Sequence, residues 1–329
     1  MTPEDRFVER LKALLPEDER VAVGPGDDAA LLRCDRGELA VTTDMLVEGV
    51  DFFPGEDARR LGRRALAVNL SDLAAVGARP EFFLLSIGFP REKGEDFPLE
   101  VAQGALSRAL PLGARLVGGD LSRAPVTVVS VALWGRPAGR PLRRSEGSAG
   151  DLIFLSGWPG RAEAGRRLAE GSLASGLLAP EHESELAAAY HDPEPRLALG
   201  LALAREELAS AAIDVSDGLG LDVGRLARAS GLRAVIETER IPISPAVAAA
   251  ARESGADPLE WALSGGDDYE LLFSALPAAA SRLEAGDGDW EVPVTRIGRL
   301  EPGEGAVAIF PSGPRDVASS GWDTFRRHV

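Results

Sequence analysis

Residues 196–238 read RLALGLALAREELASAAIDVSDGLGLDVGRLARASGLRAVIET and alternate between two periodicities. Apolar side chains recur at helical spacing over residues 196–208 and 219–229, which predicts two helices. One strand is predicted to end at residues 213–214, and a second to cover residues 234–238. Because helices and strands alternate along this stretch, it favours the α/β class.

Six short acidic motifs, one of them inside this stretch, recur where apolar runs stop. They are Gly26-Asp27-Asp28, Thr42-Thr43-Asp44, Asn69-Leu70-Ser71-Asp72, Gly118-Gly119-Asp120, Asp214-Val215-Ser216-Asp217-Gly218 and Gly265-Gly266-Asp267-Asp268. If folding gathers these carboxylates, their mutual repulsion raises their pKa values unless hard cations lie between them. Mg²⁺ takes oxygen ligands and commonly shares them with the phosphate oxygens of a substrate. The motifs therefore predict a site for Mg²⁺ and a polyphosphate.

Each motif taken alone also has a purely structural interpretation. The alternatives are an Asx turn at Asp27 and Asp28, ordinary strand threonines at Thr42 and Thr43, a water-facing helix side chain at Asp72, a β-turn at Gly118 to Asp120, and a helix N-cap at Ser216 or Asp217. Asn69 and Asp72 are three residues apart, so they share a face if they lie on a helix. Six motifs of one construction are hard to assign to chance.

The first half of the chain shows the same alternation of helix and strand patterns. Residues 39–43 predict a strand that ends at Asp44, and residues 59–76 predict a helix. Residues 115–117 predict a strand that leads into Gly118-Gly119-Asp120. The end of a strand is where open α/β sheets bind ligands, so these acids are expected at a binding edge.

A segment rich in helix and strand breakers, Gly135 to Pro141, predicts a domain boundary. A length of 329 residues also favours two domains. The expected domains are residues 1–140 and residues 141–329. The fold class is α/β of the α+β type, with a mixed sheet packed against helices in each domain.

The composition excludes several classes of partner. The net charge of −16 gives no basic footprint for nucleic acid. No apolar stretch reaches the roughly 20 residues that span a bilayer. The single cysteine, Cys34, excludes an intrachain disulfide. We therefore expect a cytoplasmic protein with no nucleic-acid or membrane partner.

Missing motifs narrow the chemistry further. Lys12 and Lys93 are the only lysines, and neither lies in a P-loop, while protein-kinase signatures are absent. A phosphate monoester has a second pKa near 6, so such an acceptor is already ionised at neutral pH and needs no general base. Arg143 and Arg144 are either phosphate clamps or solvated linker charges. Trp322 either stacks on a ring or packs in the carboxyl-terminal tail.

The combined motifs resemble the thiamine-monophosphate kinase family, part of an ATP-binding superfamily that includes aminoimidazole ribonucleotide synthetase and selenophosphate synthetase. The resemblance extends from Gly24 to Trp322. It rests on Gly-Pro-Gly-Asp-Asp-Ala-Ala-Leu-Leu from Gly24, Thr-Thr-Asp-Met-Leu-Val-Glu-Gly-Val from Thr42, Ala-Val-Asn-Leu-Ser-Asp-Leu-Ala-Ala-Val-Gly-Ala from Ala67, residues 213–219, and Leu-Ser-Gly-Gly-Asp-Asp-Tyr-Glu-Leu from Leu263. It implies a two-domain aminoimidazole ribonucleotide synthetase-like fold and transfer of the ATP γ-phosphate to thiamine monophosphate. It also implies a homodimer, and an active site in the cleft between the domains.

The same resemblance implies roles for individual residues. Several Mg²⁺ ions would be held by Asp27, Thr42, Thr43, Asp44, Asp72, Asp120, Asp214 and Asp217. ATP would contact Gly119, Arg144 and Ser216, and thiamine monophosphate would contact Asp51, Asp267 and Trp322. Asp72, Asp120 and Asp214 would act in catalysis. Asp51 stands where the family typically has His, and Asp267 where it often has Glu.

Two kinds of alternative function remain. One is another ATP-dependent enzyme of the superfamily, although selenophosphate synthetase would show a reactive cysteine near a lysine, and the hydrogenase-maturation relative would end in cysteine. The other is a non-catalytic nucleotide- or metal-binding sensor that keeps the acids without phosphoryl transfer.

Overall fold

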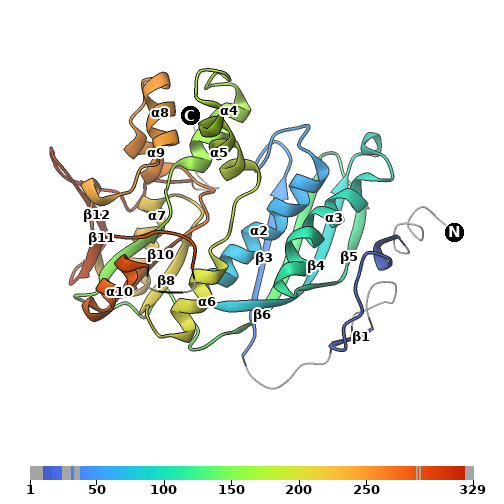
Figure 1. The fold of residues 1–329 in the computed structure, drawn as a ribbon, viewed down its shortest axis with the longest axis horizontal. Helices are drawn as coiled ribbons and strands as arrows, with labels where there is room; N and C mark the ends of the chain where they lie inside the picture. Colours follow the sequence, from blue (N-terminus) through green and yellow to red (C-terminus); the bar gives the residue numbers. More distant parts are fainter. Residues whose placement is uncertain (1–9, 24–30, 33–37, 287, 289, 323–329) are drawn as a thin grey trace. The chain divides into compact units, whose positions relative to one another are not determined.

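The structure, a computed structural model, describes residues 10–23, 31–32, 38–286, 288 and 290–322. The chain divides into two compact units. The first unit comprises the described residues up to Leu73 together with Arg79–Arg136, and the second comprises Ala74–Ala78 and the described residues from Pro137 onwards. Each unit contains a β-sheet packed against helices (Figure 1).

The first unit is a four-stranded mixed sheet with two long helices on one face. Its strands are β3 (Ala40–Val47), β6 (Val128–Pro137), β4 (Ala78–Phe89) and β5 (Arg115–Arg123), in that order across the sheet. β3 pairs antiparallel with β6, and β4 pairs parallel with β5. Helices α2 (Ala58–Val76) and α3 (Phe97–Ala109) lie across the sheet (Figure 1). A separate hairpin joins β1 (Val21–Val23) to β2 (Leu31–Leu32).

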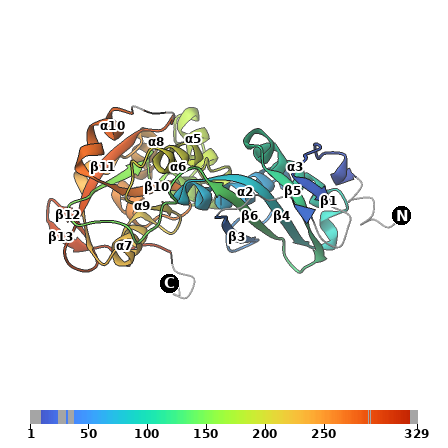
Figure 2. The same cartoon turned by 90° about the horizontal axis from the view of Figure 1, so that it is seen from below.

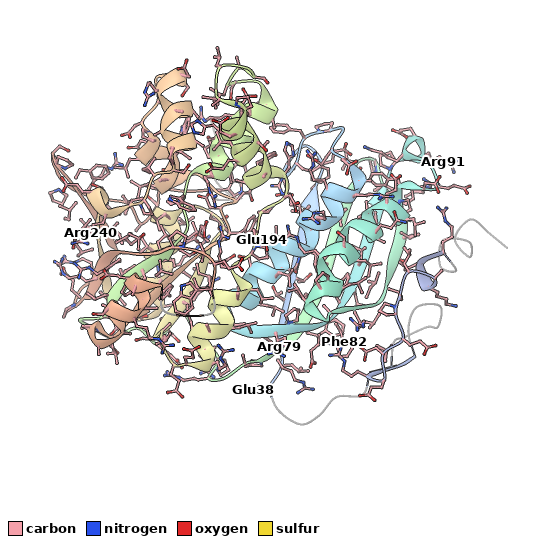
Figure 3. The ribbon with its side chains drawn as sticks, viewed as in Figure 1. Glu38, Arg79, Phe82, Arg91, Glu194 and Arg240 are labelled. Atoms are coloured by element: carbon pink, nitrogen blue, oxygen red, sulfur yellow. The ribbon has the colours of Figure 1, made fainter. Side chains whose placement is uncertain are left out.

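Alternating residues of this sheet form the core beneath the helices. Val129, Val131 and Leu133 of β6 are fully buried. On the other face, Phe82, which is labelled in Figure 3, is also buried and packs against Trp134 with ring centroids 6.2 Å apart. One face of each strand therefore packs on the helices, as the period of two requires.

Two glycines allow the helices of the first unit to approach closely. A Cβ atom at Gly62 of α2 would lie 1.9 Å from the carbonyl oxygen of Val101 in α3. A Cβ atom at Gly104 of α3 would lie 1.9 Å from the carbonyl oxygen of Arg59. The two backbones therefore meet where neither helix carries a side chain.

The second unit is a seven-stranded mixed sheet surrounded by helices. The strand order is β13 (Gly313–Asp316), β12 (Ala306–Phe310), β9 (Arg233–Glu237), β11 (Val294–Glu301), β7 (Leu152–Ser156), β10 (Glu270–Ala275) and β8 (Ala211–Val215). The helices are α4 (Arg161–Glu170), α5 (Pro180–His191), α6 (Leu197–Arg205), α7 (Leu219–Ala229), α8 (Pro245–Ser254), α9 (Pro258–Ser264) and α10 (Ala280–Ala285). Among the described strands of this sheet, only β12 and β9 pair parallel, and the other neighbours pair antiparallel.

Helix α7 covers one face of this sheet, and α10 lies on the opposite side (Figure 2). Leu219, Val223 and Leu226 recur at helical spacing along α7 and join the same buried cluster as Ile213 and Ile236 of the strands. A second cluster joins helices α4, α5 and α8. The expected fold class, a mixed sheet packed with helices in each part of the chain, is confirmed.

Two strands extend further than the sequence predicted. Asp44 does not follow a strand, because β3 continues to Val47 and pairs with β6 along its whole length. Asp120 also lies inside a strand, because β5 continues to Arg123 in register with β4. The physical reason is backbone pairing with a neighbouring strand, which overrides the low strand propensity of Gly and Asp. The helices predicted over residues 59–76 and 219–229 are confirmed to within one residue.

No helix among the described residues is long and apolar enough to cross a membrane.

Candidate active site

Strand β3 and helix α2 bring four polar side chains together. Thr42 Oγ1 donates a hydrogen bond to Asp72 Oδ2. The backbone amide of Asp44 donates to Asn69 Oδ1 over 3.1 Å, and Asn69 Nδ2 donates to the carbonyl oxygen of Ala65 over 3.0 Å. Thr42, Asp44, Asn69 and Asp72 are called here the β3–α2 cluster. Two of the six motifs therefore meet, and the shared helix face expected for Asn69 and Asp72 is confirmed.

The electrostatics of this cluster favour a bound cation. Burial and the nearby charge of Asp72 raise the pKa of Asp44 to about 7. The ionised form of Asp44 is therefore disfavoured unless a positive charge lies beside it. Carboxylate and hydroxyl oxygens are ligands that suit Mg²⁺, so Asp44, Asp72 and Thr42 fit such an ion.

Asp51 lies in the turn that follows β3. Its Oδ2 accepts a hydrogen bond of 2.7 Å from the backbone amide of Val47. Its charge is also one of the causes that raise the pKa of Asp44, after burial and Asp72. The predicted acceptor-binding residue is therefore electrostatically coupled to the β3–α2 cluster.

The structure keeps two other predicted ligands of the first unit apart from this cluster. Thr43 lies on the opposite face of β3, and its Oγ1 donates to the carbonyl oxygen of Val131 over 2.9 Å. Asp120 lies on β5, the opposite edge strand, three strand spacings or about 14 Å from β3.

Gly119 has a structural reason to be glycine. A Cβ atom there would lie 1.8 Å from the carbonyl oxygen of Leu85 on β4, its partner in the parallel pairing. Its backbone is thus held tightly in the sheet, while Asp120 beside it is exposed. Asp27 and Asp28 lie outside the described residues.

In the second unit, the turn between β8 and α7 is shaped by a buried carboxylate. Asp222 Oδ2 accepts hydrogen bonds from the backbone amides of Ser216, at 3.1 Å, and Asp217, at 3.0 Å. Arg225 Nη1 bridges Asp217 Oδ2, at 2.5 Å, and Asp222 Oδ1, at 2.7 Å. Asp214, at the end of β8, is 3% exposed. The motif thus places a buried acid, a half-buried serine and a half-buried acid in one turn.

Asp222 and Arg225 were missed at the sequence level. Burial raises the pKa of Asp222 to about 6, although Arg225 and the Asp217 amide oppose that shift. The available signal was the position of Asp222 in the first turn of α7, where a carboxylate can accept from preceding amides.

A second turn meets the first through backbone hydrogen bonds. The loop of residues 265–269, called here the 265–269 loop, precedes β10. The amide of Asp267 donates to the carbonyl oxygen of Ser216 over 2.7 Å. The amide of Tyr269 donates to the carbonyl oxygen of Val215 over 2.8 Å. Tyr269 Oη also donates to Asp267 Oδ1 over 2.8 Å. The structure therefore brings together the two acidic motifs of the second unit.

The two other acids of this loop region have structural partners. Asp268 Oδ2 accepts from the Gly160 amide over 2.6 Å, and its Oδ1 accepts from the Ala162 amide over 3.1 Å, at the start of α4. Burial raises the pKa of Asp268 to about 7, while these amides oppose the shift. Glu270 is fully buried and pairs with Arg196. Asp268 belongs to one of the six acidic motifs, but neither it nor Glu270 was given a role of its own, and no sequence pattern pointed to Arg196 as the partner of Glu270.

Trp322 and Arg144, which were predicted to contact the acceptor and ATP, lie at different ends of α7. The amide of Trp322 donates to the carbonyl oxygen of Asp217 over 2.7 Å, so the carboxyl-terminal segment meets the turn before α7. Arg144 is held at the other end, because Ser230 Oγ donates to its carbonyl oxygen over 2.8 Å. The 11 residues of α7 separate these places by about 16 Å of helix.

Across the described residues, no three His, Cys, Asp or Glu side chains form a group that could hold a metal ion by itself. The β3–α2 cluster offers two carboxylates and a hydroxyl. Mg²⁺ commonly completes its coordination with water and substrate phosphate, so a partial set of protein ligands is what a metal–nucleotide site requires.

Both parts of the chain match one protein family. Residues 26–136 match the model of the AIR synthase related protein N-terminal domain, and residues 148–310 match that of the C-terminal domain. The chain is therefore an AIR synthase related protein.

Curated and solved relatives narrow the family. A thiamine-monophosphate kinase of Salmonella typhimurium strain LT2 is 38% identical over 309 residues, which are 93% of this chain and 92% of the relative. The crystal structure of thiamine-monophosphate kinase from Stenotrophomonas maltophilia K279a is 37% identical, with a TM-score of 0.80, and the match covers 92% of this chain and 95% of that chain. A structure described as AaThiL complexed with AMPPCP and TMP is 29% identical, with a TM-score of 0.78, covering 98% and 96% of the two chains. The chain belongs to the thiamine-monophosphate kinase family.

Proposed function

We propose that this chain transfers the γ-phosphate of ATP to thiamine monophosphate, giving thiamine diphosphate and ADP. The observation that carries this proposal is the 37–38% identity to thiamine-monophosphate kinases along nearly the whole chain. The relative complexed with AMPPCP and TMP supports the same pair of substrates. The alternatives within the superfamily are less well supported, because the hydrogenase maturation proteins HypE that share the fold are only 19–20% identical to this chain.

Mg²⁺ is proposed as the metal, with Asp44, Asp72 and Thr42 as ligands in the first unit. When bound, the ion would neutralise phosphate charge and orient the transferring group. The remaining proposed ligands are Asp27, Thr43, Asp120, Asp214 and Asp217. The raised pKa of Asp44 supports this assignment, because it identifies a carboxyl group whose ionised form lacks a positive partner.

The side chains of this protein would mainly bind and orient the substrates. Gly119, Arg144 and Ser216 are proposed to contact ATP, and Asp51, Asp267 and Trp322 are proposed to contact the acceptor. Asp222 fixes the amides of Ser216 and Asp217. The acceptor oxygen belongs to a phosphate that is already ionised near neutral pH, so no side chain has to remove a proton. Catalysis then depends on alignment and electrostatic stabilisation, in which Asp72, Asp120 and Asp214 are proposed to act.

A homodimer is also proposed. β3 is an edge strand, and Val41 and Met45 on its outer face are 69% and 58% exposed. An exposed apolar edge strand is a ready surface for pairing with another chain. The cytoplasmic location expected from the sequence stays a prediction.

The function is tested by incubating the purified chain with ATP, Mg²⁺ and a panel of phosphate acceptors. We expect ADP and thiamine diphosphate from thiamine monophosphate, no product from thiamine, and loss of turnover when EDTA removes the metal. Transfer to another acceptor would favour a different enzyme of the superfamily. Nucleotide and metal binding without any transfer would favour the sensor.

A further inference from the structure

The 265–269 loop has an unusual backbone. Asp267 and Tyr269 have φ angles of 66° and 50°, in the left-handed region that residues with side chains rarely adopt. Among the described residues, Glu207 is the one other non-glycine with a positive φ. Two such residues separated by a single position persist only where the surrounding structure holds them.

An ion pair anchors the loop at its carboxyl end. Glu270 Oε2 accepts from Arg196 Nε over 2.6 Å, and Glu270 Oε1 accepts from Arg196 Nη2 over 2.7 Å. Arg161 Nη2 also donates to Oε1 over 3.1 Å, and Ser156 Oγ donates to Oε2 over 2.6 Å. The bidentate contact with Arg196 holds the Glu270 side chain in place, and this side chain is fully buried. Because Glu270 follows Tyr269 in the sequence, the contact anchors the end of the loop.

The charges around Arg196 show that its contact with Glu270 is favourable. Burial is the largest single influence and lowers the pKa of Arg196, but Glu270, Glu194 and Asp268 together outweigh it, so the pKa lies above its ordinary value. Glu194, labelled in Figure 3, adds a smaller contribution in the same direction. The guanidinium therefore stays charged and paired.

Even-numbered and odd-numbered residues from Asp267 to Glu270 have different partners. Asp268 and Glu270 are held by α4 and by Arg196, whereas Asp267 and Tyr269 contact the end of β8 and each other. The contacts that hold Asp268 and Glu270 in place thus determine where the side chains of Asp267 and Tyr269 lie. The backbone of Asp267 is thereby held against Ser216, and its carboxylate is held by the hydroxyl of Tyr269.

We propose that Arg196 and Glu270 are positioning residues for the acceptor substrate: their ion pair holds Asp267 and Tyr269 in the left-handed conformation and so orients the Asp267 carboxylate. A carboxylate in a fixed orientation suits the cationic thiazolium ring or the amino group of thiamine monophosphate. This inference rests on the proposed function, in which Asp267 contacts the acceptor.

A positioning role and a merely structural role predict different kinetics. If the pair orients Asp267, its loss raises the KM for thiamine monophosphate more than the KM for ATP. If the pair only supports the unit, its loss lowers the melting temperature and affects both substrates alike.

The test uses Arg196→Lys, which keeps the charge but loses the two-pronged geometry. The control is Arg233→Lys, because Arg233 also pairs with a glutamate through Nε and Nη2, donating both to Glu301 Oε1 at a more exposed place away from the loop. We expect the KM for thiamine monophosphate to rise about tenfold in Arg196→Lys, with the KM for ATP within about twofold of the wild type. The control should change neither constant.

Hydrogen exchange of the peptide covering the 265–269 loop tests whether the ion pair holds the loop, separately from whether the loop governs acceptor binding. Faster exchange of the Asp267 and Tyr269 amides is expected in Arg196→Lys, and this readout needs no turnover. Unchanged exchange would overturn the positioning role. Faster exchange with an unchanged KM for the acceptor, or with equal rises in both KM values, would overturn the link to acceptor recognition. A wild-type protein that phosphorylates no thiamine monophosphate would instead refute the proposed function.

Tyr269→Phe is a second variant that keeps the ring and removes only the hydroxyl that donates to Asp267. If Arg196→Lys fails to fold, this variant still decides the question. A selective rise in the KM for thiamine monophosphate is expected, and an unchanged KM would count against the orientation of Asp267 as a determinant of binding.

Discussion

Single carboxyl groups in this protein differ because their surroundings differ. Asp44 is half-buried beside another acid and has a raised pKa, whereas Asp18 has its pKa lowered to about 2, mainly by hydrogen bonds from Arg20. Asp268 is buried but receives two backbone amides at the start of α4. At the residue scale, the acids that lack a positive partner are the ones suited to a cation.

Asp72→Asn is expected to lower kcat by about 100- to 1000-fold, the range found for single groups that stabilise charge during a reaction. The side chain keeps its shape, so the melting temperature should change little. Asp96→Asn is the control, because Asp96 is an exposed acid of the same unit that pairs with Arg10. Steady-state kinetics at saturating Mg²⁺ provides the measurement. Full activity in Asp72→Asn would remove this residue from the proposed ligands.

The raised pKa of Asp44 predicts how stability depends on pH without metal. The folded protein keeps this proton up to a pKa of about 7, whereas the unfolded chain releases it near 3.8. The folded state therefore binds more protons, and stability falls as the pH rises from about 4 to about 7. Asp44→Asn should show a smaller fall over this range, and Mg²⁺ should stabilise the wild type more at pH 8 than at pH 5. Thermal melts with EDTA or Mg²⁺ test this, and equal pH profiles for both proteins would contradict it.

At the element scale, close packing of α2 on α3 holds one half of the β3–α2 cluster in place. Gly62 is needed for this contact, because a Cβ atom would meet the carbonyl oxygen of Val101. A shift of α2 would move Asn69 and Asp72 relative to β3. The geometry of the cluster therefore depends on a contact that none of its own residues makes.

Gly62→Ala is expected to lower the free energy of unfolding by roughly 1–3 kcal/mol, the usual cost of overpacking. Gly224→Ala in α7 is the matched control, since its Cβ atom would find its nearest atom, the Cα of Ala318, at 3.1 Å. There the higher helix propensity of alanine offsets a mild contact. Urea denaturation measures both variants, and equal stabilities would contradict the tight helix contact.

Local patterns predicted the helices better than the strands. Residues 219–229 were recognised as a helix because apolar residues recur at helical spacing. The continuation of β3 through Asp44 was missed because pairing with β6, more than 80 residues later, supports it. Likewise, the partner of Glu270 is Arg196, 74 residues away in sequence. The acidic motifs identified the candidate ligands, but the residues that orient them depend on such distant contacts.

At the scale of the whole molecule, each unit has its own sheet, core and acidic turn. The first unit carries the β3–α2 cluster, and the second carries the β8–α7 turn and the 265–269 loop. Within the described residues, neither unit gathers three His, Cys, Asp or Glu side chains that could hold a metal ion. The activity is assigned to the complete chain because the similarity to thiamine-monophosphate kinases covers 93% of it.

The apolar outer face of β3 predicts self-association. Light scattering after size exclusion should give twice the mass of one chain. Val41→Glu combined with Met45→Glu should yield a monomer, because two charges would have to be buried in the interface. Leu276→Glu, an exposed apolar residue of the second unit, is the control and should leave the mass unchanged. A monomeric wild type would refute the dimer.

The most direct measurement is a crystal structure with Mn²⁺ in place of Mg²⁺, a non-hydrolysable ATP analogue and thiamine monophosphate. We expect anomalous scattering peaks within coordination distance of Asp44 and Asp72, with nucleotide phosphate oxygens on the same ions. A bound nucleotide whose metal ions contact neither carboxylate would contradict the account.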